Sequence, residues 1–231
     1  MDVLRILEWD PFYNSKYDQI GVYKLTPKKT NVTKDKILDA AIDLFSQKGF
    51  SGVSIREITK EVGIKESSLY NHYKNKDEIL EQILSAFRKE FAKTLPPVSL
   101  LDDILENSTL EGFFERGFER FREHIDNETN EKCWRILFME QFRSAAAREI
   151  FLNDLIKDTL DFLEVVFEKL IELGKIKDTY SPAVLASEYQ YPTFSMLVEY
   201  NMLRFDQKDT SVIEAKMKNH IRFFLENVSE K

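Results

Sequence analysis

Apolar side chains recur at helical spacing in the first clearly patterned part of the chain. In the segment 33–48 they fall on one face of a helix with 3.6 residues per turn, at Ile37, Ala40, Ala41, Leu44 and Phe45. Thr33 is the expected N-cap, because its hydroxyl can accept a backbone N–H of the first turn. Gly49 is the expected end, because glycine readily adopts the left-handed conformation that closes a helix. The pattern therefore predicts an amphipathic helix over residues 33–48.

Two short helices and a longer one are predicted directly afterwards. Ser54 and Glu57 have the S-x-x-E spacing of a capping box, so a helix begins there and ends at Gly63. Apolar residues resume at Leu69, and Asn75 is the expected N-cap of the longer helix. Two short helices joined by a turn that contains glycine, with a third helix in front, are the pattern of a helix-turn-helix module.

Helical periodicity continues through the rest of the chain. The predicted helices cover residues 100–105, 111–125, 131–147, 149–173, 182–204 and 210–228. Pro182 stands at the first position of one helix, and Pro192 is expected to kink it. The composition agrees, because the chain has only 7 Gly and 6 Pro, the residues that most often end helices. The fold class is therefore predicted to be all-α.

Composition excludes several classes of protein. Neither G-x-G-x-x-G nor G-x-x-x-x-G-K-[ST] occurs, so the glycine loops of dinucleotide-binding and P-loop proteins are absent from the sequence. No apolar run approaches the roughly 18 residues of a membrane span, and Glu8 and Asp10 interrupt any secretory signal. Cys133 is the sole cysteine and the three histidines are scattered, which argues against a disulfide framework or a metal cluster. We expect a cytoplasmic protein with no catalytic residues, no metal, no cofactor and no membrane contact.

The charge is distributed unevenly. The net charge of the chain is −7, which by itself argues against a nucleic-acid partner. Residues 28–80 carry 10 Lys and Arg against 8 Asp and Glu, a net charge of +2, whereas residues 81–231 carry 20 against 28, a net charge of −8. The division indicates a mildly basic module joined to an acidic one.

The basic module carries a family resemblance. Its sequence over residues 34–80 is KDKILDAAIDLFSQKGFSGVSIREITKEVGIKESSLYNHYKNKDEIL. This run resembles the N-terminal DNA-binding domain of the TetR family of transcriptional regulators, and the resemblance extends from Thr33 to Leu84. It implies an N-terminal three-helix helix-turn-helix domain joined to a larger helical domain for ligand binding and dimerisation. The expected domains are a DNA-binding domain over residues 31–80 and an effector-binding and dimerisation domain over residues 81–231.

The resemblance also implies which side chains meet DNA. The helix near residues 65–70 would lie in the major groove, where Lys65 can bind a guanine edge or a phosphate. Tyr70 would contact a phosphate or a thymine methyl group, and Lys76 would bind a phosphate beside a helix N-terminus. Tyr73 is expected in the core. The expected DNA-binding residues are Ser54, Arg56, Lys65, Glu66, Ser67, Ser68, Tyr70, Asn71, His72, Lys74 and Lys76.

Three positions of the recognition helix depart from what the resemblance leads us to expect. Family members often have Ser, Thr or Ala at the position of Lys65 and Gly at that of Ser67. A lysine side chain accepts no hydrogen bond, so this helix should be capped less firmly. Glu66 is acidic on a face meant for DNA, so it either accepts from a cytosine amino group or points away. These departures leave the operator sequence open.

Aromatic residues are concentrated in the larger domain. They either fill a core of large side chains or line an apolar effector cavity between helices. Trp134, Phe138 and Phe142 follow i, i+4, i+8 spacing and would share one face, which makes that helix the expected pocket wall. The candidate pocket residues are Phe87, Phe91, Phe118, Trp134, Phe138, Phe142, Phe162, Tyr191 and Phe194.

The resemblance further implies a homodimer through the last two long helices, which pair with their twofold mates. The apolar positions expected at this seam are Val184, Leu185, Tyr189, Met196, Val198, Met202, Ile213, Met217, Ile221 and Phe224.

The leading hypothesis is a homodimeric repressor that binds a palindromic DNA operator and is released by a small, largely apolar effector. One alternative is a helical enzyme or ligand carrier with a vestigial DNA module, although no catalytic set of residues supports it. Another is a regulator that has no effector. Residues 1–30 form an aromatic-rich extension that could pack on a neighbouring domain, contact DNA, or exchange between protomers of a dimer.

Overall fold

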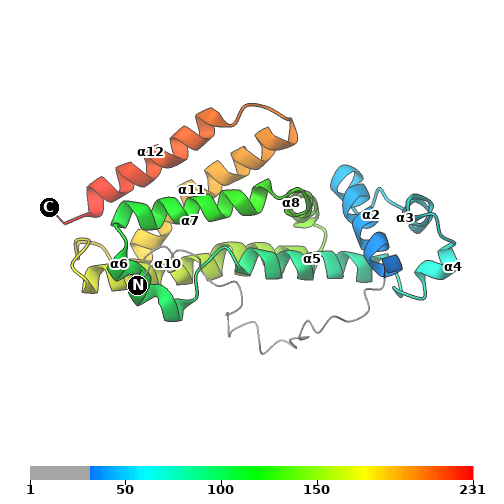
Figure 1. The fold of residues 1–231 in the computed structure, drawn as a ribbon, viewed down its shortest axis with the longest axis horizontal. Coiled ribbons are helices and arrows are strands. Elements are labelled where there is room, and N and C mark those ends of the chain that lie inside the picture. Colours follow the sequence, from blue (N-terminus) through cyan, green and yellow to red (C-terminus); the bar gives the residue numbers. More distant parts are fainter. Residues whose placement is uncertain (1–31, 231) are drawn as a thin grey trace. The chain divides into compact units, whose positions relative to one another are not determined.

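The computed structural model describes residues 32–230, and Figure 1 shows their arrangement as a series of helices. The proposed roles of residues 1–30 lie outside the described residues. Apart from one isolated β-bridge between Ile176 and Ser229, the described chain consists of helices and the turns that join them. The elements are α2 (Val32–Lys48), α3 (Ile55–Val62), α4 (Glu66–Leu69), α5 (Lys76–Ala92), the 3-10 turn η2 (Val98–Leu100), α6 (Leu101–Asn107), α7 (Leu110–Asp126), α8 (Glu128–Glu140), α9 (Ala145–Glu149), the π-helical segment η3 (Ile150–Lys157), α10 (Asp158–Glu172), α11 (Pro182–Phe205) and α12 (Ser211–Val228). The predicted all-α fold class is confirmed.

Most helix ends follow the signals in the sequence. Three glycines adopt the expected positive φ where helices end: Gly49 at 72°, Gly63 at 75° and Gly174 at 63°. Asn75 caps α5 by accepting the backbone N–H of Glu78 at 2.8 Å. The predicted N-cap at Thr33 is wrong, because α2 already includes Val32 and places Thr33 within its first turn.

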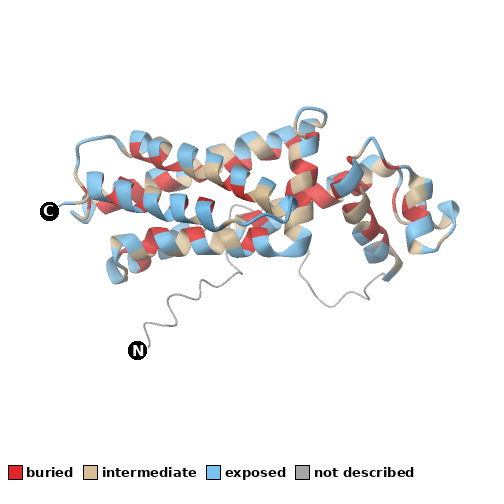
Figure 2. Ribbon diagram, turned by 90° about the horizontal axis from the view of Figure 1, so that it is seen from above, coloured by how far each residue is buried: buried red, intermediate tan, exposed pale blue. Residues whose placement is uncertain are grey.

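The described chain divides into two compact units. The N-terminal unit comprises residues 32–93 and 124–152, and the C-terminal unit comprises residues 94–123 and 153–230. In the N-terminal unit α2 packs against α3, α5 and α8, while in the C-terminal unit α10 packs on α11 and α11 on α12. Figure 2 shows that buried residues lie along one side of the helices and exposed residues along the other, as amphipathic patterns require.

The compact units do not follow the predicted domain limits. Helices α5, α8 and α9, which the predicted limits place mostly in the domain of residues 81–231, belong to the N-terminal unit, where α5 and α8 pack against α2 and α9 packs against α5 and α8. The predicted boundary at residue 80 concerns function as well as packing, and it stays a prediction.

Two predicted helices are subdivided in the structure. The helix expected over residues 131–147 ends at Glu140, and α9 starts after a turn with Ser144 as its N-cap. The helix expected over residues 149–173 opens with the π-helical segment η3 before α10. Apolar periodicity does not show such interruptions, because the residues on both sides of the turn remain apolar and helix-forming.

Two kinds of feature do not occur in the described part of the chain. None of the helices between residues 32 and 230 has the length and apolar character needed to cross a membrane. Across the same residues, no group of three or more His, Cys, Asp or Glu side chains is placed to hold a metal ion.

Candidate nucleic-acid interface

The first helix of the helix-turn-helix module, α3, is firmly capped. The Ser54 hydroxyl accepts the backbone N–H of Glu57 at 3.2 Å, and the Glu57 carboxylate accepts the backbone N–H of Ser54 at 2.8 Å. These are the two reciprocal bonds of the predicted capping box. The Ser54 backbone N–H, followed by the ammonium of Lys48, lowers the pKa of Glu57 to about 2. Glu57 therefore stays ionised and holds the start of α3 at any physiological pH.

The turn between α3 and α4 depends on Gly63. Its φ of 75° lies in the left-handed region, where glycine has no side chain to clash with the backbone. The N–H of Gly63 donates to the carbonyl of Lys60 at 3.2 Å, and the N–H of Ile64 donates to the carbonyl of Thr59 at 3.0 Å. The turn thus satisfies the last carbonyls of α3 and sends the chain directly into α4.

The expected recognition helix, α4, is a single short turn. Lys65 is its N-cap and makes no capping hydrogen bond through its side chain, which confirms the weaker capping expected from the sequence. Leu69 is completely buried and anchors the helix to the core. Tyr70 comes directly after it and remains 53% exposed, so a buried and a solvent-facing side chain stand next to each other at the end of α4.

The remaining residues expected at the DNA face lie in the same stretch of 23 positions, from residue 54 to residue 76. Ser68 and His72 are half-buried, while the other members of the set outside α5 are exposed to solvent. The exposed members are Ser54, Arg56, Lys65, Glu66, Ser67, Tyr70, Asn71 and Lys74. The module therefore exposes several polar side chains and one tyrosine, and their contact with DNA stays a prediction.

Lys76 has a different environment from the one expected. Its ammonium donates to the carbonyls of Phe50 and Val53 at 2.7 Å and 2.6 Å, and it lies 4.2 Å from the centre of the Phe50 ring. The ammonium therefore joins α5 to the turn between α2 and α3. In this arrangement the Lys76 side chain is a structural link, and a phosphate would have to compete with both carbonyls for it.

Tyr73 lies in the core, as expected. It is 1% exposed, and the ammonium of Lys34 lies 4.8 Å from the centre of its ring. Burial raises the pKa of the Tyr73 hydroxyl to about 12, and the nearby carboxylate of Asp35 acts in the same direction. Tyr73 therefore stays neutral and contributes packing to the module rather than a DNA contact.

Four of the candidate pocket residues meet in the N-terminal unit. Phe87 and Phe91 on α5 contact Trp134 on α8 edge-on, with ring centres 5.0 Å and 5.9 Å apart. Trp134 stacks in turn on Phe138 at 5.6 Å. Together with His124, these residues form the α5–α8 aromatic cluster, and their role in effector binding stays a prediction.

His124 was not singled out by the sequence, because an isolated histidine carries no local signal. It lies 6.1 Å from the rings of both Phe87 and Phe91. Its Nδ1 lies 3.1 Å from the side-chain amide nitrogen of Asn130. Burial lowers the pKa of His124 to about 4, so the imidazole is neutral near pH 7 and accepts from the amide through Nδ1.

The other candidate pocket residues do not join this cluster. Phe142 is 85% exposed, because α8 ends at Glu140 and the predicted helical face does not extend to it. In the C-terminal unit Phe118 is buried, Phe162 and Phe194 are half-buried, and Tyr191 is exposed. The assignment of Phe142 and Tyr191 to an enclosed pocket is therefore wrong for this structure.

A second aromatic cluster, which the sequence did not assign to a pocket, lies in the C-terminal unit. Tyr189 on α11 lies between Phe114 and Phe224, with ring centres 4.9 Å and 5.3 Å away. Phe167 on α10 contacts the same group. The cluster joins α7, α10, α11 and α12, and all four rings are buried.

The sequence is similar to several known regulators. The sequence model described as "Bacterial regulatory proteins, tetR family" matches residues 37–83. Over 149 residues the chain is 30% identical to the protein named Probable HTH-type transcriptional regulator YttP of Bacillus subtilis (strain 168), and the match covers 64% of this chain and 67% of that protein. It is 59% identical over 46 residues to the biofilm operon negative transcriptional regulator IcaR of Staphylococcus epidermidis, and this match covers 20% of the chain and 25% of the relative.

Solved structures extend the likeness of fold to most of the chain. A structure of a protein from Mesorhizobium loti that is assigned to the TetR family has a TM-score of 0.63 at 19% identity and covers 88% of this chain and 100% of its own. The structure of the SmeT–triclosan complex has a TM-score of 0.59 at 19% identity and covers 87% of this chain and 93% of its own. The helix-turn-helix geometry, the family match over residues 37–83 and the relative that shares 30% identity agree. The chain belongs to the TetR family of transcriptional regulators.

Proposed function

We propose that this regulator is a homodimeric repressor that binds a palindromic DNA operator and leaves it when a small, largely apolar effector binds. The observation that carries the proposal is the helix-turn-helix module, in which α4 is anchored by a buried leucine and is flanked by exposed polar side chains. TetR-family regulators are DNA-binding proteins without enzymatic activity, so the expectation that this chain is not an enzyme is confirmed.

Support for the DNA-binding face comes from the exposed side chains around α4. Lys65 and Tyr70 stand at its two ends and are both exposed. The ammonium of Lys65 can bind a guanine edge or a phosphate, and the hydroxyl of Tyr70 can donate to a phosphate. Leu69 fixes the orientation of this face, because it is buried completely.

Support for repression comes from a relative with high identity in the DNA-binding module. IcaR is named as a negative transcriptional regulator, and its 59% identity spans 46 residues. Since that match covers a quarter of IcaR, it supports a similar mode of DNA binding, while the genes that this chain regulates are left to experiment.

Support for a dimer comes from apolar side chains that the C-terminal unit leaves exposed. The predicted seam needs correction, because Leu185, Tyr189, Ile213, Met217, Ile221 and Phe224 are buried within the chain itself. Other large apolar residues of α11 and α12 are exposed, and a second protomer could cover them. They are Val184, Tyr191, Met202, Phe205, Val212 and Phe223.

The dimer can be tested by charging one of these positions. Met202→Lys and Phe223→Lys each place an ammonium on the proposed interface, where burial without a partner is unfavourable. We expect both variants to sediment as monomers at concentrations where the wild type is a dimer. Lys218→Met replaces an exposed lysine of α12 by an apolar residue, and it controls for effects of surface substitution that do not involve the interface. A monomeric wild type would refute the proposed dimer.

Support for an apolar effector comes from the α5–α8 aromatic cluster and from a structural relative. SmeT was solved with triclosan, and triclosan is itself a small aromatic molecule. Binding of an effector to the folded chain must raise its midpoint of thermal unfolding. A thermal-shift screen of lipophilic compounds is expected to find such a ligand, and the ligand should weaken operator binding in the same concentration range.

The operator is the first thing to be identified. Wild-type protein would be mixed with sheared genomic DNA, and the bound fragments would be recovered and sequenced. We expect enrichment of an inverted repeat, since a twofold dimer places its recognition helices about 34–36 Å apart, one turn of the double helix. Recovery of fragments with no shared sequence would contradict the proposal of a specific operator.

A further inference from the structure

The C-terminal end of α2 is built differently from the ends of two comparable helices. Helices α2, α3 and α10 all end at a glycine with positive φ. After α3 and α10, the residue next to the glycine donates its N–H back to a carbonyl of the same helix, at 3.0 Å and 2.9 Å. This is the bond that closes a Schellman motif, so a carbonyl at each of these helix ends is satisfied within the same segment of chain.

At α2 the corresponding N–H is that of Phe50, and it does not donate to a carbonyl of α2. It donates to Oε1 of Glu140, the last residue of α8, at 3.0 Å. Glu140 is only 1% exposed. α2 itself closes with a single bond from the N–H of Gly49 to the carbonyl of Phe45 at 2.9 Å, and the next N–H, that of Phe50, is satisfied by a buried carboxylate from a helix that is distant in sequence.

Phe50 is also held on its other side. Its carbonyl accepts the ammonium of Lys76 on α5 at 2.7 Å, and the same ammonium lies over its ring. Both partners of Phe50 are charged residues, and hydrogen bonds to charged groups are stronger than bonds between neutral groups. This one residue thus ties the end of α2 to α8 and to α5.

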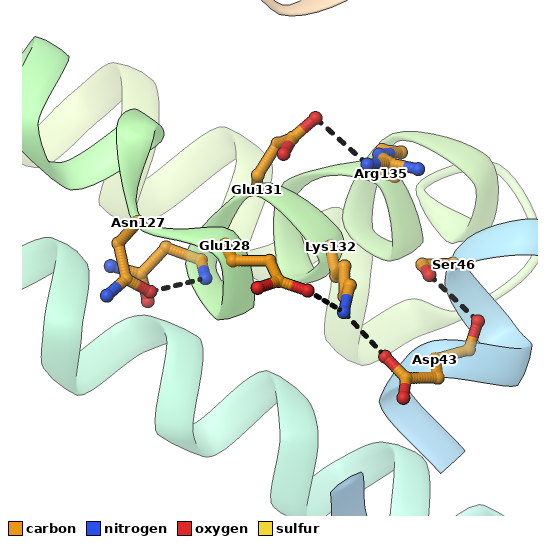
Figure 3. Close-up of polar contacts among 8 residues, drawn as sticks. Asp43, Ser46, Asn127, Glu128, Glu131, Lys132 and Arg135 are labelled. Atoms are coloured by element: carbon orange, nitrogen blue, oxygen red, sulfur yellow. Dashed lines mark hydrogen bonds and ion pairs between the residues drawn. The ribbon is translucent and has the colours of Figure 1, made fainter. Parts of the chain in front are cut away.

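A second polar contact between α8 and α2 lies along the same face of α8. The ammonium of Lys132 lies between Asp43 of α2, at 2.7 Å, and Glu128 of its own helix, at 2.6 Å (Figure 3). Lys132, Ile136 and Glu140 have i, i+4, i+8 spacing, so they share one helical face, and Ile136 is completely buried. This face of α8 therefore contacts α2 through Lys132 and the turn after α2 through Glu140.

Phe50 lies immediately before the entry into the helix-turn-helix. The turn after Phe50 passes through Val53, whose carbonyl also accepts Lys76, to Ser54, the N-cap of α3. The orientation of α3 and α4 relative to α2 is therefore determined in the turn over residues 50–54, which begins at the residue bonded to Glu140. We propose that Glu140 is a positioning residue for DNA binding: by accepting the N–H of Phe50 it fixes α3 and α4 relative to α2. The inference rests on the proposed role of α4 in operator binding.

Two substitutions distinguish the effect of the length of the Glu140 side chain from the effect of its charge. Glu140→Gln removes the charge but keeps a carbonyl oxygen at the same distance, so it can still accept the N–H of Phe50. Glu140→Asp keeps the charge but withdraws the oxygens by one methylene. Glu131→Asp is the matched control, because the Glu131 carboxylate bonds to Arg135 within α8. Circular dichroism would establish that each variant keeps its helix content.

The first measurement is hydrogen exchange at the Phe50 amide in the free protein. We expect slow exchange in the wild type, in Glu140→Gln and in Glu131→Asp. In Glu140→Asp the exchange should be about tenfold faster, since loss of a hydrogen bond at this half-buried amide favours local opening. Exchange in Glu140→Asp as slow as in the wild type would overturn the proposed bond.

The second measurement is affinity for a DNA fragment that the wild type selects from genomic DNA. We expect Glu140→Asp to bind about tenfold more weakly, a change of about 1.4 kcal/mol, and Glu140→Gln to stay within about threefold of the wild type. Faster exchange with undiminished DNA affinity would overturn the positioning role. Weakening in Glu140→Gln equal to that in Glu140→Asp would also overturn it, because the amide keeps the acceptor oxygen on which the role depends. If the wild type selects no DNA, the proposed operator binding fails, and the positioning role falls with it while the exchange result still decides the Phe50 bond.

Discussion

His124 should make the stability of this protein fall in mild acid, because the folded chain holds its imidazole in the neutral form. The ring belongs to the α5–α8 aromatic cluster, and Nδ1 faces the side-chain amide of Asn130 at 3.1 Å. Burial is the main reason why its pKa falls from 6.5 to about 4; the charge of Glu90 opposes the change and that of Lys93 assists it. In the unfolded chain these influences are absent, and the imidazole titrates near 6.5.

The sign of the effect is determined by the two pKa values. Between pH 6.5 and about 4, the unfolded chain binds a proton at His124 that the folded chain does not, so the free energy of unfolding falls as the pH falls. The contribution is fully present above pH 6.5 and is lost progressively down to about pH 4. At 1.36 kcal/mol per pKa unit, the loss amounts to about 2 kcal/mol at pH 5 and about 3 kcal/mol at pH 4.

The assay compares the wild type with His124→Gln in urea unfolding at pH 7 and pH 5, monitored by circular dichroism. Glutamine does not titrate, and its side-chain carbonyl can still accept from the Asn130 amide. We expect the wild type to lose about 2 kcal/mol more than the variant between these two pH values. Equal losses in the two proteins would refute the reasoning, as would an NMR titration of the His124 ring in the folded protein with a midpoint near 6.5.

Three further predictions concern the helix-turn-helix module and the lone thiol. Lys76→Met removes two hydrogen bonds from an ammonium to backbone carbonyls and should lower the free energy of unfolding by about 2 kcal/mol in chemical denaturation; an unchanged value would show that the two bonds are not needed. Gly63→Ala places a side chain at a φ of 75° and should lower the free energy of unfolding by about 1 kcal/mol. The cause would be backbone strain alone, because open space surrounds the added methyl group. The control Gly117→Ala also meets open space but lies inside α7, so it should leave the free energy of unfolding the same or raise it. Burial raises the pKa of the Cys133 thiol to about 12, so alkylation by iodoacetamide at pH 8 should be slow in the folded protein and fast in urea; rapid alkylation without denaturant would contradict the burial of α8.

Local signals in the sequence were sufficient for the parts of the module that depend on neighbouring residues. The capping box at Ser54 and Glu57, the cap at Asn75 and the stop at Gly63 each involve a few consecutive positions, and the residue types alone indicate them. The all-α fold was predictable in the same way, from periodicity and from the scarcity of glycine and proline.

Features that depend on packing between distant segments were not accessible in this way. The ammonium of Lys76 binds the turn at residues 50–53 rather than facing outward, and a rule about helix N-termini does not indicate that this turn lies beside it. Glu140 is buried and binds Phe50, which is 90 positions away in the sequence, so no local pattern indicates this contact. Phe142 kept the correct helical spacing, but the helix ends two residues before it.

The dimer seam illustrates the same limit on a larger scale. Apolar periodicity in α11 and α12 identifies residues that avoid water, but it does not distinguish a side chain buried within its own chain from one covered by a second protomer. The structure separates the two groups, because Leu185 and Ile221 are buried by the chain itself whereas Met202 and Phe223 are exposed.

The most direct test of the account is the DNA affinity of a variant at the exposed end of α4. Tyr70→Ala removes a side chain that is 53% exposed, and Tyr180→Ala removes a similarly exposed tyrosine, at 59%, from the C-terminal unit. Fluorescence anisotropy with a labelled fragment selected by the wild type would measure both variants at one salt concentration. The account predicts at least about a tenfold loss of affinity for Tyr70→Ala and wild-type affinity for Tyr180→Ala. Wild-type affinity in Tyr70→Ala would contradict the assignment of α4 as the DNA-binding face.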